Sequence, residues 1–371
     1  MAEFSRSPEQ LCLSLTVADL PKDILSEILL LLPPKSILRC RAVCKAWCAV
    51  TSDRDFLLAH HRRQPPRRLL TFLRDVDYGW EFDDKNRDYM EIYYSNSDCE
   101  SPLEVHAACN GLLLLSYNNC LHLCNPTTRQ WVWVSPPALP CDKVAGLYHA
   151  HDEYRVLYYR AIGLECTFYV STVGSGKERC IPPYSSSTSL RAWFAERLKF
   201  PIFREPFLFH GNLHWLAEKD NILMFNTVDE VFQWLPLPFK GFASSLLETE
   251  GKLAVSKRTK SSVDLWLLQD YERVVWVHKY QIELPVIDIR RFEEMDLWDP
   301  HIVSEEGDVW IDAGCWQLHY DRKGNLLEKF QCDGRVVEFT AHILRESLVP
   351  DAVFQNSDND SRHAPHFFRW L

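Results

Sequence analysis

The chain has 371 residues, enough for one large domain or two smaller ones, and its 46% hydrophobic and 25% charged residues exclude global disorder. The net charge of −10 is uneven: residues 1–70 carry 11 Lys/Arg against 7 Asp/Glu (+4), and the rest 30 against 44 (−14). The acidic balance of the larger part disfavours nucleic-acid binding, and no apolar run approaches the roughly 18 residues that a membrane span needs.

Residues 1–17 are predicted to form a flexible tail. They contain an early glutamate and no basic segment leading into an apolar core, so they do not resemble a signal peptide. We therefore expect a protein of the cytoplasm and/or nucleus, whose 13 cysteines are reduced thiols. No CxxC pair occurs, and we expect neither a metal site nor a cofactor.

Helical spacing of the apolar residues follows this tail. A first helix is predicted to begin at Pro21 and to end before Pro33. A second and a third follow over 35–43 and 44–52, and Asp53 is positioned to cap a short fourth helix or turn. The proline pair at 65–66 marks the end of this helical region.

The stretch SEILLLLPPK, residues 26–35, has more leucines than a surface helix needs. On a helical projection the apolar face comprises Ile24, Leu25, Ile28, Leu29 and Leu32, and the polar face comprises Lys22, Asp23, Ser26 and Glu27. Leu30 lies near the middle of the polar face and Leu31 at its margin. We predict that Leu31 faces a partner protein, and that Leu30 either joins it or faces the second domain.

From about Leu69 the hydrophobic period changes to two, and short aromatic-rich segments separated by turns indicate strands. A weak repeat runs through them. In one copy Gly111 precedes Asn125 by 14 residues, and Trp133 follows by 8. Two further copies follow the same pattern, at Gly211–Asn226–Trp234 and at Gly307–Asp321. A looser copy follows Gly251, and its turn residue is either Asp264 or Asp270.

Each repeat predicts strands joined by a Gly turn and an Asx turn, in a small sheet that cannot bury its face alone. Radial stacking of such sheets gives a β-propeller. The 100 residues between Gly111 and Gly211 correspond to two blades. We expect about six blades, with seven as the other possible count, and a closing sheet that pairs strands from both ends of the domain; a β-sandwich is the alternative.

The helical segment resembles an F-box, the three-helix module that binds Skp1. The matching residues are Leu20-Pro21, Asp23, Glu27-Ile28-Leu29, Leu32-Pro33, Lys35-Ser36, Arg41, Val43-Cys44-Lys45 and Trp47. The phrase CNGLLLL…LCNPTTRQW, residues 109–131, resembles the F-box-associated (kelch-like) propeller domain of plant F-box proteins. The expected domains are an F-box over 18–64, a propeller over 69–345 and a C-terminal tail over 346–371.

This resemblance implies a non-catalytic substrate-receptor subunit of an SCF (Skp1–cullin–F-box) E3 ubiquitin ligase. The F-box would dock on a Skp1-like protein, and through it on the cullin and RING subunits. The propeller would present an unidentified protein target for ubiquitination and degradation. Neither nucleic acid nor a membrane is an expected partner.

The residues expected to face Skp1, or to support that interface, are Leu20, Pro21, Ile24, Ile28, Leu31, Leu32, Pro33, Ile37, Val43 and Trp47. The competing interpretation places these residues in the core of the helical module. For Ile24, Val43 and Trp47 the sequence favours neither the core nor the interface.

Two other functions remain open from the sequence. One is a propeller that binds glycans or acts as an enzyme beneath a helical cap, and the other is a Skp1-binding protein that works outside a cullin complex. No GxSxG, HExxH or GxGxxG motif occurs. HAHDE (149–153) could ligate a metal, but a polar blade loop is the favoured interpretation.

Overall fold

The computed structural model of this chain contains two compact units. One comprises Met1–Pro65 with Glu346–Val349, and the other Pro66–Arg345 with Pro350–Leu371. The structure describes residues 21–74, 89–95, 104–117, 120–134, 142–162, 165–175, 177–181, 206–216, 220–241, 243–290, 299–302, 307–313, 316–331 and 336–355.

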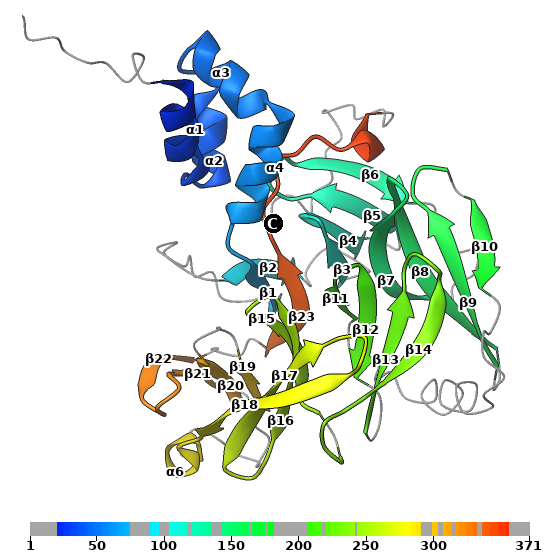
Figure 1. Cartoon of the computed structure of the whole chain (residues 1–371), viewed down its shortest axis with the longest axis vertical. Helices are drawn as coiled ribbons and strands as arrows, with labels where there is room; N and C mark the ends of the chain where they lie inside the picture. The colour runs from blue at the N-terminus through cyan, green and yellow to red at the C-terminus, as the bar shows by residue number, and fades with distance from the viewer. Residues whose placement is uncertain are drawn as a thin grey trace, which may run out of the picture. The chain divides into compact units, whose positions relative to one another are not determined.

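Among the residues that the structure describes, the first unit contains four helices, drawn in blue in Figure 1. They are α1 (Lys22–Leu30), α2 (Pro34–Cys40), α3 (Lys45–Ser52) and α4 (Arg54–Arg63). As predicted, Pro21 begins the first helix, and the Asp53 carboxylate accepts a hydrogen bond from the Phe56 amide at 3.0 Å to cap the fourth. The fourth segment is therefore a full helix. The second helix begins at Pro34, one residue before its predicted start. Within the described part of the chain, no helix has the length and apolar character needed to cross a membrane.

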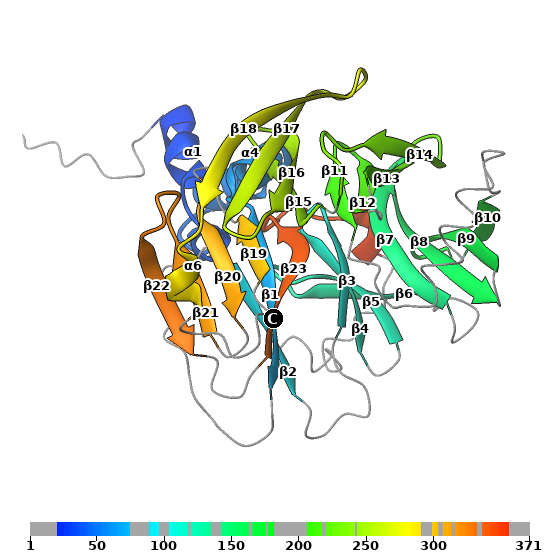
Figure 2. The same cartoon turned by 90° about the horizontal axis from the view of Figure 1, so that it is seen from below.

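The second unit contains five four-stranded antiparallel sheets among its described residues (Figure 2). Blade 1 consists of β3 (Glu104–Cys109), β4 (Leu112–Tyr117), β5 (Cys120–Asn125) and β6 (Gln130–Val134). Blade 2 consists of β7 (Asp142–Ala150), β8 (Glu153–Ile162), β9 (Glu165–Thr172) and β10 (Glu178–Ile181). Blade 3 consists of β11 (Phe207–Phe209), β12 (Asn212–Leu216), β13 (Asn221–Asn226) and β14 (Val231–Pro236). Blade 4 consists of β15 (Ser245–Thr249), β16 (Lys252–Arg258), β17 (Ser262–Asp270) and β18 (Val275–Glu283). Blade 5 consists of β19 (Asp299–Ile302), β20 (Val309–Ala313), β21 (Trp316–Tyr320) and β22 (Leu326–Gln331).

The turns explain why the repeat recurs at a fixed spacing. In blades 1 to 4 the first hairpin is a two-residue turn with positive φ at both positions, the geometry that matches strand twist; the pairs are Asn110–Gly111, His151–Asp152, His210–Gly211 and Glu250–Gly251. In four blades the turn after the third strand is an Asx turn, in which a carboxylate or amide oxygen accepts two backbone N–H groups; the residues are Asn125, Asn226, Asp270 and Asp321. Asp270 is thus the turn residue in the looser copy, while Asp264 contacts His278 at 3.0 Å.

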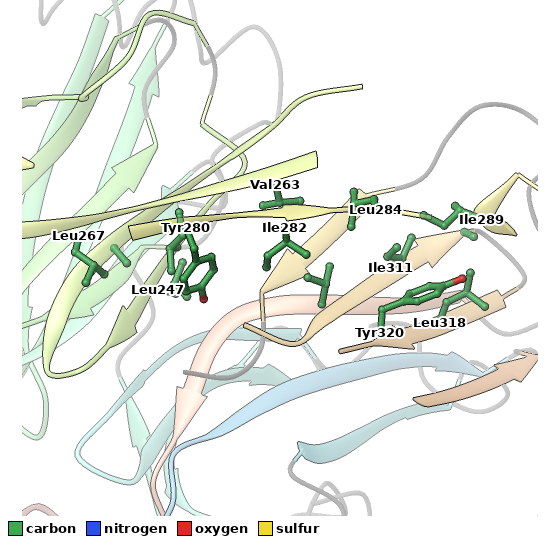
Figure 3. Close-up of a cluster of buried hydrophobic side chains, with 14 residues drawn as sticks. Leu247, Val263, Leu267, Tyr280, Ile282, Leu284, Ile289, Ile311, Leu318 and Tyr320 are labelled. Carbon is green, nitrogen blue, oxygen red and sulfur yellow. The ribbon is translucent and has the colours of Figure 1, made fainter. Parts of the chain in front are cut away.

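Neighbouring blades share hydrophobic cores, as a propeller requires. Figure 3 shows the core between blades 4 and 5, where Leu247, Val263 and Ile282 pack with Ile311 and Leu318. Separate clusters join blade 1 to blade 2, blade 2 to blade 3 and blade 3 to blade 4. Each sheet therefore buries a face that it could not bury alone, which is the physical basis of the propeller.

The expectation of about six blades is wrong, because the described part of the chain forms five. The remaining sheet has three strands in the order β2-β1-β23, with β1 (Arg67–Arg74), β2 (Tyr89–Ser95) and β23 (Val336–Leu344). As predicted, it pairs strands from both ends of the domain, since β1 is antiparallel to β23. The N-terminal part of the domain supplies two described strands to this sheet. The hydrophobic period of two predicts that such segments are strands, but it does not show which strands pair in one sheet.

Candidate docking surface

The first helix exposes a row of apolar side chains. Ile24 is 50% exposed, Ile28 46% and Leu31 79%. Their spacing of four and three residues places them on one side of the helix and its C-terminal end. We call Ile24, Ile28 and Leu31 the docking stripe. In a folded unit this small, an ordered row of exposed apolar side chains indicates a binding surface rather than chance.

The core-facing side of α1 differs from the helical projection. Leu25, Leu29 and Leu30 are buried, whereas Ile24 and Ile28, which the projection placed on the apolar face, are exposed. Leu30 lies in the hydrophobic core of the helical unit and not on a partner-facing side. The projection treated the most apolar face as the covered one, whereas the side of α1 that is covered is the one that carries Leu25, Leu29 and Leu30.

The other predicted docking residues fall into three groups. Pro21, Pro33 and Val43 are exposed, Val43 by 62%. Ile37 is fully buried, so it can act only by supporting the surface, while Leu32 and Trp47 are half-buried against the same core. Leu20 lies outside the described residues. Leu38, 38% exposed on α2, was not among the predicted residues; it directly follows the buried Ile37, about 100° further round the helix.

Polar contacts hold the ends of the helices around this surface. The His60 Nε2 atom lies 2.8 Å from the Leu32 carbonyl oxygen, which ties α4 to the chain just after α1. Arg63 donates to Glu27 at 2.9 Å across the same two helices. Because both side chains of this ion pair are largely exposed, it adds little to the free energy of unfolding and mainly orients α1 relative to α4. The docking stripe is therefore presented by a helix secured at its C-terminal end.

A buried polar cluster centred on Glu230 lies among the described residues of the second unit. The Glu230 carboxylate accepts hydrogen bonds from Tyr148 at 2.9 Å, from Arg155 at 2.9 Å and from Arg179. Burial and the adjacent Glu230 charge raise the pKa of Tyr148 above its usual range. Because Glu230 is 7% exposed and joins blades 2 and 3, the cluster holds two blades together.

His214 of blade 3 forms the second polar cluster, together with Tyr271 from the β17–β18 turn of blade 4. Its Nδ1 atom is 3.2 Å from the Phe207 carbonyl and its Nε2 atom 2.5 Å from the Tyr271 hydroxyl. Burial lowers the pKa of His214 to about 4, so the imidazole is neutral near pH 7. Neutral Nδ1–H then donates to the carbonyl, and Nε2 accepts from the tyrosine.

The HAHDE segment does not form a ligand set in the described structure. His151 and Asp152 form the β7–β8 turn, and His149 packs edge-on against Tyr154. Over the described residues, no three or more His, Cys, Asp or Glu side chains gather so as to hold a metal ion.

Two sequence families match the chain. Residues 17–64 match the F-box-like family, and residues 74–312 match the family described as the F-box associated beta propeller domain. The second match covers more than half of the 371 residues. The chain belongs to the F-box proteins that carry this propeller domain. An F-box domain implies binding to Skp1, so the docking stripe lies in the domain from which such binding is expected.

This F-box protein is similar to several curated proteins of Arabidopsis thaliana. F-box protein CPR1 is 26% identical over 316 residues, which is 72% of this chain and 74% of that protein. F-box protein At3g17710 is 24% identical over 383 residues, 89% of this chain and 96% of that protein. F-box/LRR-repeat/kelch-repeat protein At2g27520 is 27% identical over 308 residues, 74% and 81% of the two chains.

The F-box unit also contains a segment from the far end of the chain. Glu346–Val349 belongs to the compact unit of the helices, and Leu348 is a member of its core. Sequence analysis assigned these residues to a C-terminal tail beyond the propeller. No local pattern in RESLVPD identifies a packing partner 285 positions away, so only the tertiary structure reveals this contact.

Proposed function

We propose that this F-box protein is the substrate-receptor subunit of an SCF-type ubiquitin ligase. It docks on a Skp1-like protein through Ile24, Ile28 and Leu31, with Pro21, Pro33 and Val43 at the margin. The observation that carries the proposal is the exposed docking stripe on α1 within a matched F-box.

The energetics of the docking stripe favour binding. Each of its side chains leaves about half or more of its surface in water. Covering an aliphatic side chain of this kind contributes about 1–2 kcal/mol at the usual coefficient for apolar area. Three such side chains on one helix form the central apolar anchors of an interface, while the buried Ile37 and Leu29 keep the helices in place behind them.

In this proposal the propeller holds the protein target. The ligase gains its rate by keeping target lysines near the ubiquitin-loaded enzyme that the cullin and RING subunits bring, so this chain contributes proximity rather than chemistry. The charge of −14 beyond residue 70 favours a target with a basic surface. The free cysteines of the described residues agree with work in the reducing cytoplasm or nucleus.

Binding to purified Skp1-like protein tests the proposal, with Leu31→Asp as the variant and Ile287→Asp as its matched control. Both positions are almost equally exposed, at 79% and 77%, but Ile287 lies in the second unit on α6 (Val286–Ile289). We expect Leu31→Asp to weaken binding at least tenfold and Ile287→Asp to leave it unchanged.

Two results would contradict this function. If the parent chain does not bind Skp1, the propeller is a binding protein or enzyme of another kind beneath a helical cap. If it binds Skp1 but does not co-purify with cullin, the protein acts outside the ligase. Ubiquitination of a captured target in the reconstituted complex completes the test.

A further inference from the structure

A short segment near the C-terminus completes the core of the F-box unit. Leu348 is 3% exposed and Ser347 also 3%, and Val349 packs against the same cluster. His61 on α4 approaches the Glu346 carbonyl oxygen with its Nδ1 atom at 2.9 Å. We call Glu346–Val349 the core-completing segment.

The F-box helices form a small core without this segment. Their buried apolar side chains are few, and Leu348 adds a further one from outside the helices; the helical members are Leu25, Leu29, Leu30, Ile37, Cys40, Val50, Phe56 and Leu57. Domains of this length bury a smaller fraction of their surface than larger domains do, and they are marginally stable by themselves. A single additional buried leucine therefore has a large effect on the fraction of molecules in which the helices are locally unfolded.

Leu30 connects this core to the docking stripe. It directly precedes Leu31, and it is 7% exposed within the cluster that contains Leu348. Loss of the core-completing segment would leave this side of α1 with less apolar cover. The C-terminal end of α1, which presents Leu31, would then be less well held.

The core-completing segment is anchored in the second unit on both sides. Before it, β23 ends at Leu344, which is 1% exposed. After it, the short helix η2 (Ala352–Phe354) is capped by the Asp351 carboxylate at 3.0 Å, and Phe354 is buried in the core of blades 1 and 2. A segment tethered at both ends has few conformations to lose, so it binds the helices at high effective concentration.

We propose that Glu346–Val349 is a fifth element of the Skp1-docking module, and that Leu348 is a positioning residue for docking. The segment does not touch Skp1 in this proposal; it keeps α1 and α4 assembled so that the docking stripe is preformed. The inference rests on the proposed function, because it concerns the same interface. It predicts that Skp1 affinity depends on residues about 300 positions from the F-box helices.

The test uses the full chain with Leu348→Asp, the conservative Leu348→Met, and Leu327→Asp as a control at a half-exposed leucine of β22. We expect Leu348→Asp to weaken Skp1 binding at least tenfold and to speed amide hydrogen exchange in α1 and α4 by a similar factor. Exchange in β3–β18 should stay unchanged. Leu348→Met and Leu327→Asp should remain within threefold of the parent in both measurements.

A reciprocal measurement separates docking from simple structural support. Skp1 stabilises the assembled unit, so by linkage its addition to the parent should slow exchange at the Leu348 and Val349 amides at least tenfold. Unchanged exchange and affinity in Leu348→Asp would overturn the inference, as would faster exchange with unchanged affinity. Failure of the parent itself to bind Skp1 would instead overturn the proposed function, and it is seen before any variant is compared.

Discussion

At the scale of single residues, buried charge is concentrated at Glu230. Three donors from blade 2 converge on one carboxylate oxygen, while Glu230 itself comes from the turn of blade 3. Removing one member of a buried ion pair leaves the other charge without compensation, which destabilises more than the pair stabilised. Without Glu230, Arg155, whose side chain is 14% exposed, would keep only its contact with the half-exposed Glu153 carboxylate at 3.1 Å.

Glu230→Gln is therefore expected to lower the free energy of unfolding by about 3 kcal/mol. Urea unfolding followed by tryptophan fluorescence measures it, since 12 of the 13 tryptophans lie beyond residue 66. Glu248→Gln, at an exposed acid of blade 4, is the control and should change stability by less than about 0.5 kcal/mol. Equal stability of the two variants would show that the Glu230 cluster holds nothing together.

His214 makes stability depend on pH in a defined direction. Its pKa is about 4 in the folded chain and 6.5 as the ordinary value, so between these pH values the unfolded chain binds a proton that the folded chain does not. The free energy of unfolding should thus fall as pH decreases from about 6.5, and level off for this group below about 4. The loss between pH 7 and pH 5 is roughly 2 kcal/mol.

The control for this prediction is His214→Asn, which removes the titrating group. Its stability at pH 7 should be lower, because a buried polar contact is altered, but its change between pH 7 and pH 5 should be smaller than that of the parent. His122, whose pKa burial also lowers, remains in both proteins and contributes in the same direction. An identical pH profile in parent and variant would contradict the assignment.

At the scale of elements, the caps decide where helices and turns begin. Asp53 satisfies the Phe56 amide at the start of α4, the helix that supplies Phe56, Leu57 and His60 to the interior of the F-box unit. The Asx turns play the same role in the blades, since each fixes the register of the last hairpin by binding two amides. Short polar side chains thus define the boundaries, and apolar side chains fill the interior.

Asp53→Ala is expected to destabilise α4 by about 1 kcal/mol, the usual effect of losing an N-cap. Amide exchange in the first two turns of α4 should become about fivefold faster in the full chain. Asp55→Ala, at an exposed acid of the same turn that makes no cap, serves as the comparison. If both variants exchange alike, the helix start depends on the helix dipole and not on the cap.

At the scale of the whole molecule, a ring of blades depends on its closure. The sheet of β1, β2 and β23 brings the beginning and the end of the propeller domain into one set of hydrogen bonds. Contacts of β23 with β3 and β15 link this sheet to blades 1 and 4. A defect in β23 should therefore be felt beyond its own sheet.

Leu344→Ala removes a side chain that is 1% exposed at the end of β23, opposite Arg67. We expect a loss of about 2–5 kcal/mol from the free energy of unfolding of the second unit, as for other buried leucines. The urea midpoint by tryptophan fluorescence measures it, and Leu326→Ala at a 42% exposed position is the control. A loss limited to exchange in β1 and β23, with an unchanged midpoint, would show that closure and blades unfold independently.

Much of this architecture was readable from local patterns. Proline and Asp53 positions predicted the helices, the period of two predicted the strands, and Asn125 and Asn226 predicted the turns, because each of these signals acts within a few residues. Exposed Ile24, Ile28 and Leu31 were also among the predicted docking residues. Ile37 was also among the predicted docking residues, although it is buried. A core residue and a residue of the docking surface follow the same helical periodicity, so the sequence does not separate them.

The sequence alone determined that an F-box-like helical region precedes a propeller, and that α1 has more apolar surface than its own unit needs. Only the tertiary structure decided that the described strands form five blades rather than six, that Leu30 is buried while Ile24 and Ile28 are exposed, and that Leu348 packs with the F-box helices. The reason is physical. Periodicity records that a side chain must be covered, but contacts between residues far apart in the chain decide what covers it, and an interface residue awaiting a partner follows the same pattern as a residue of the core.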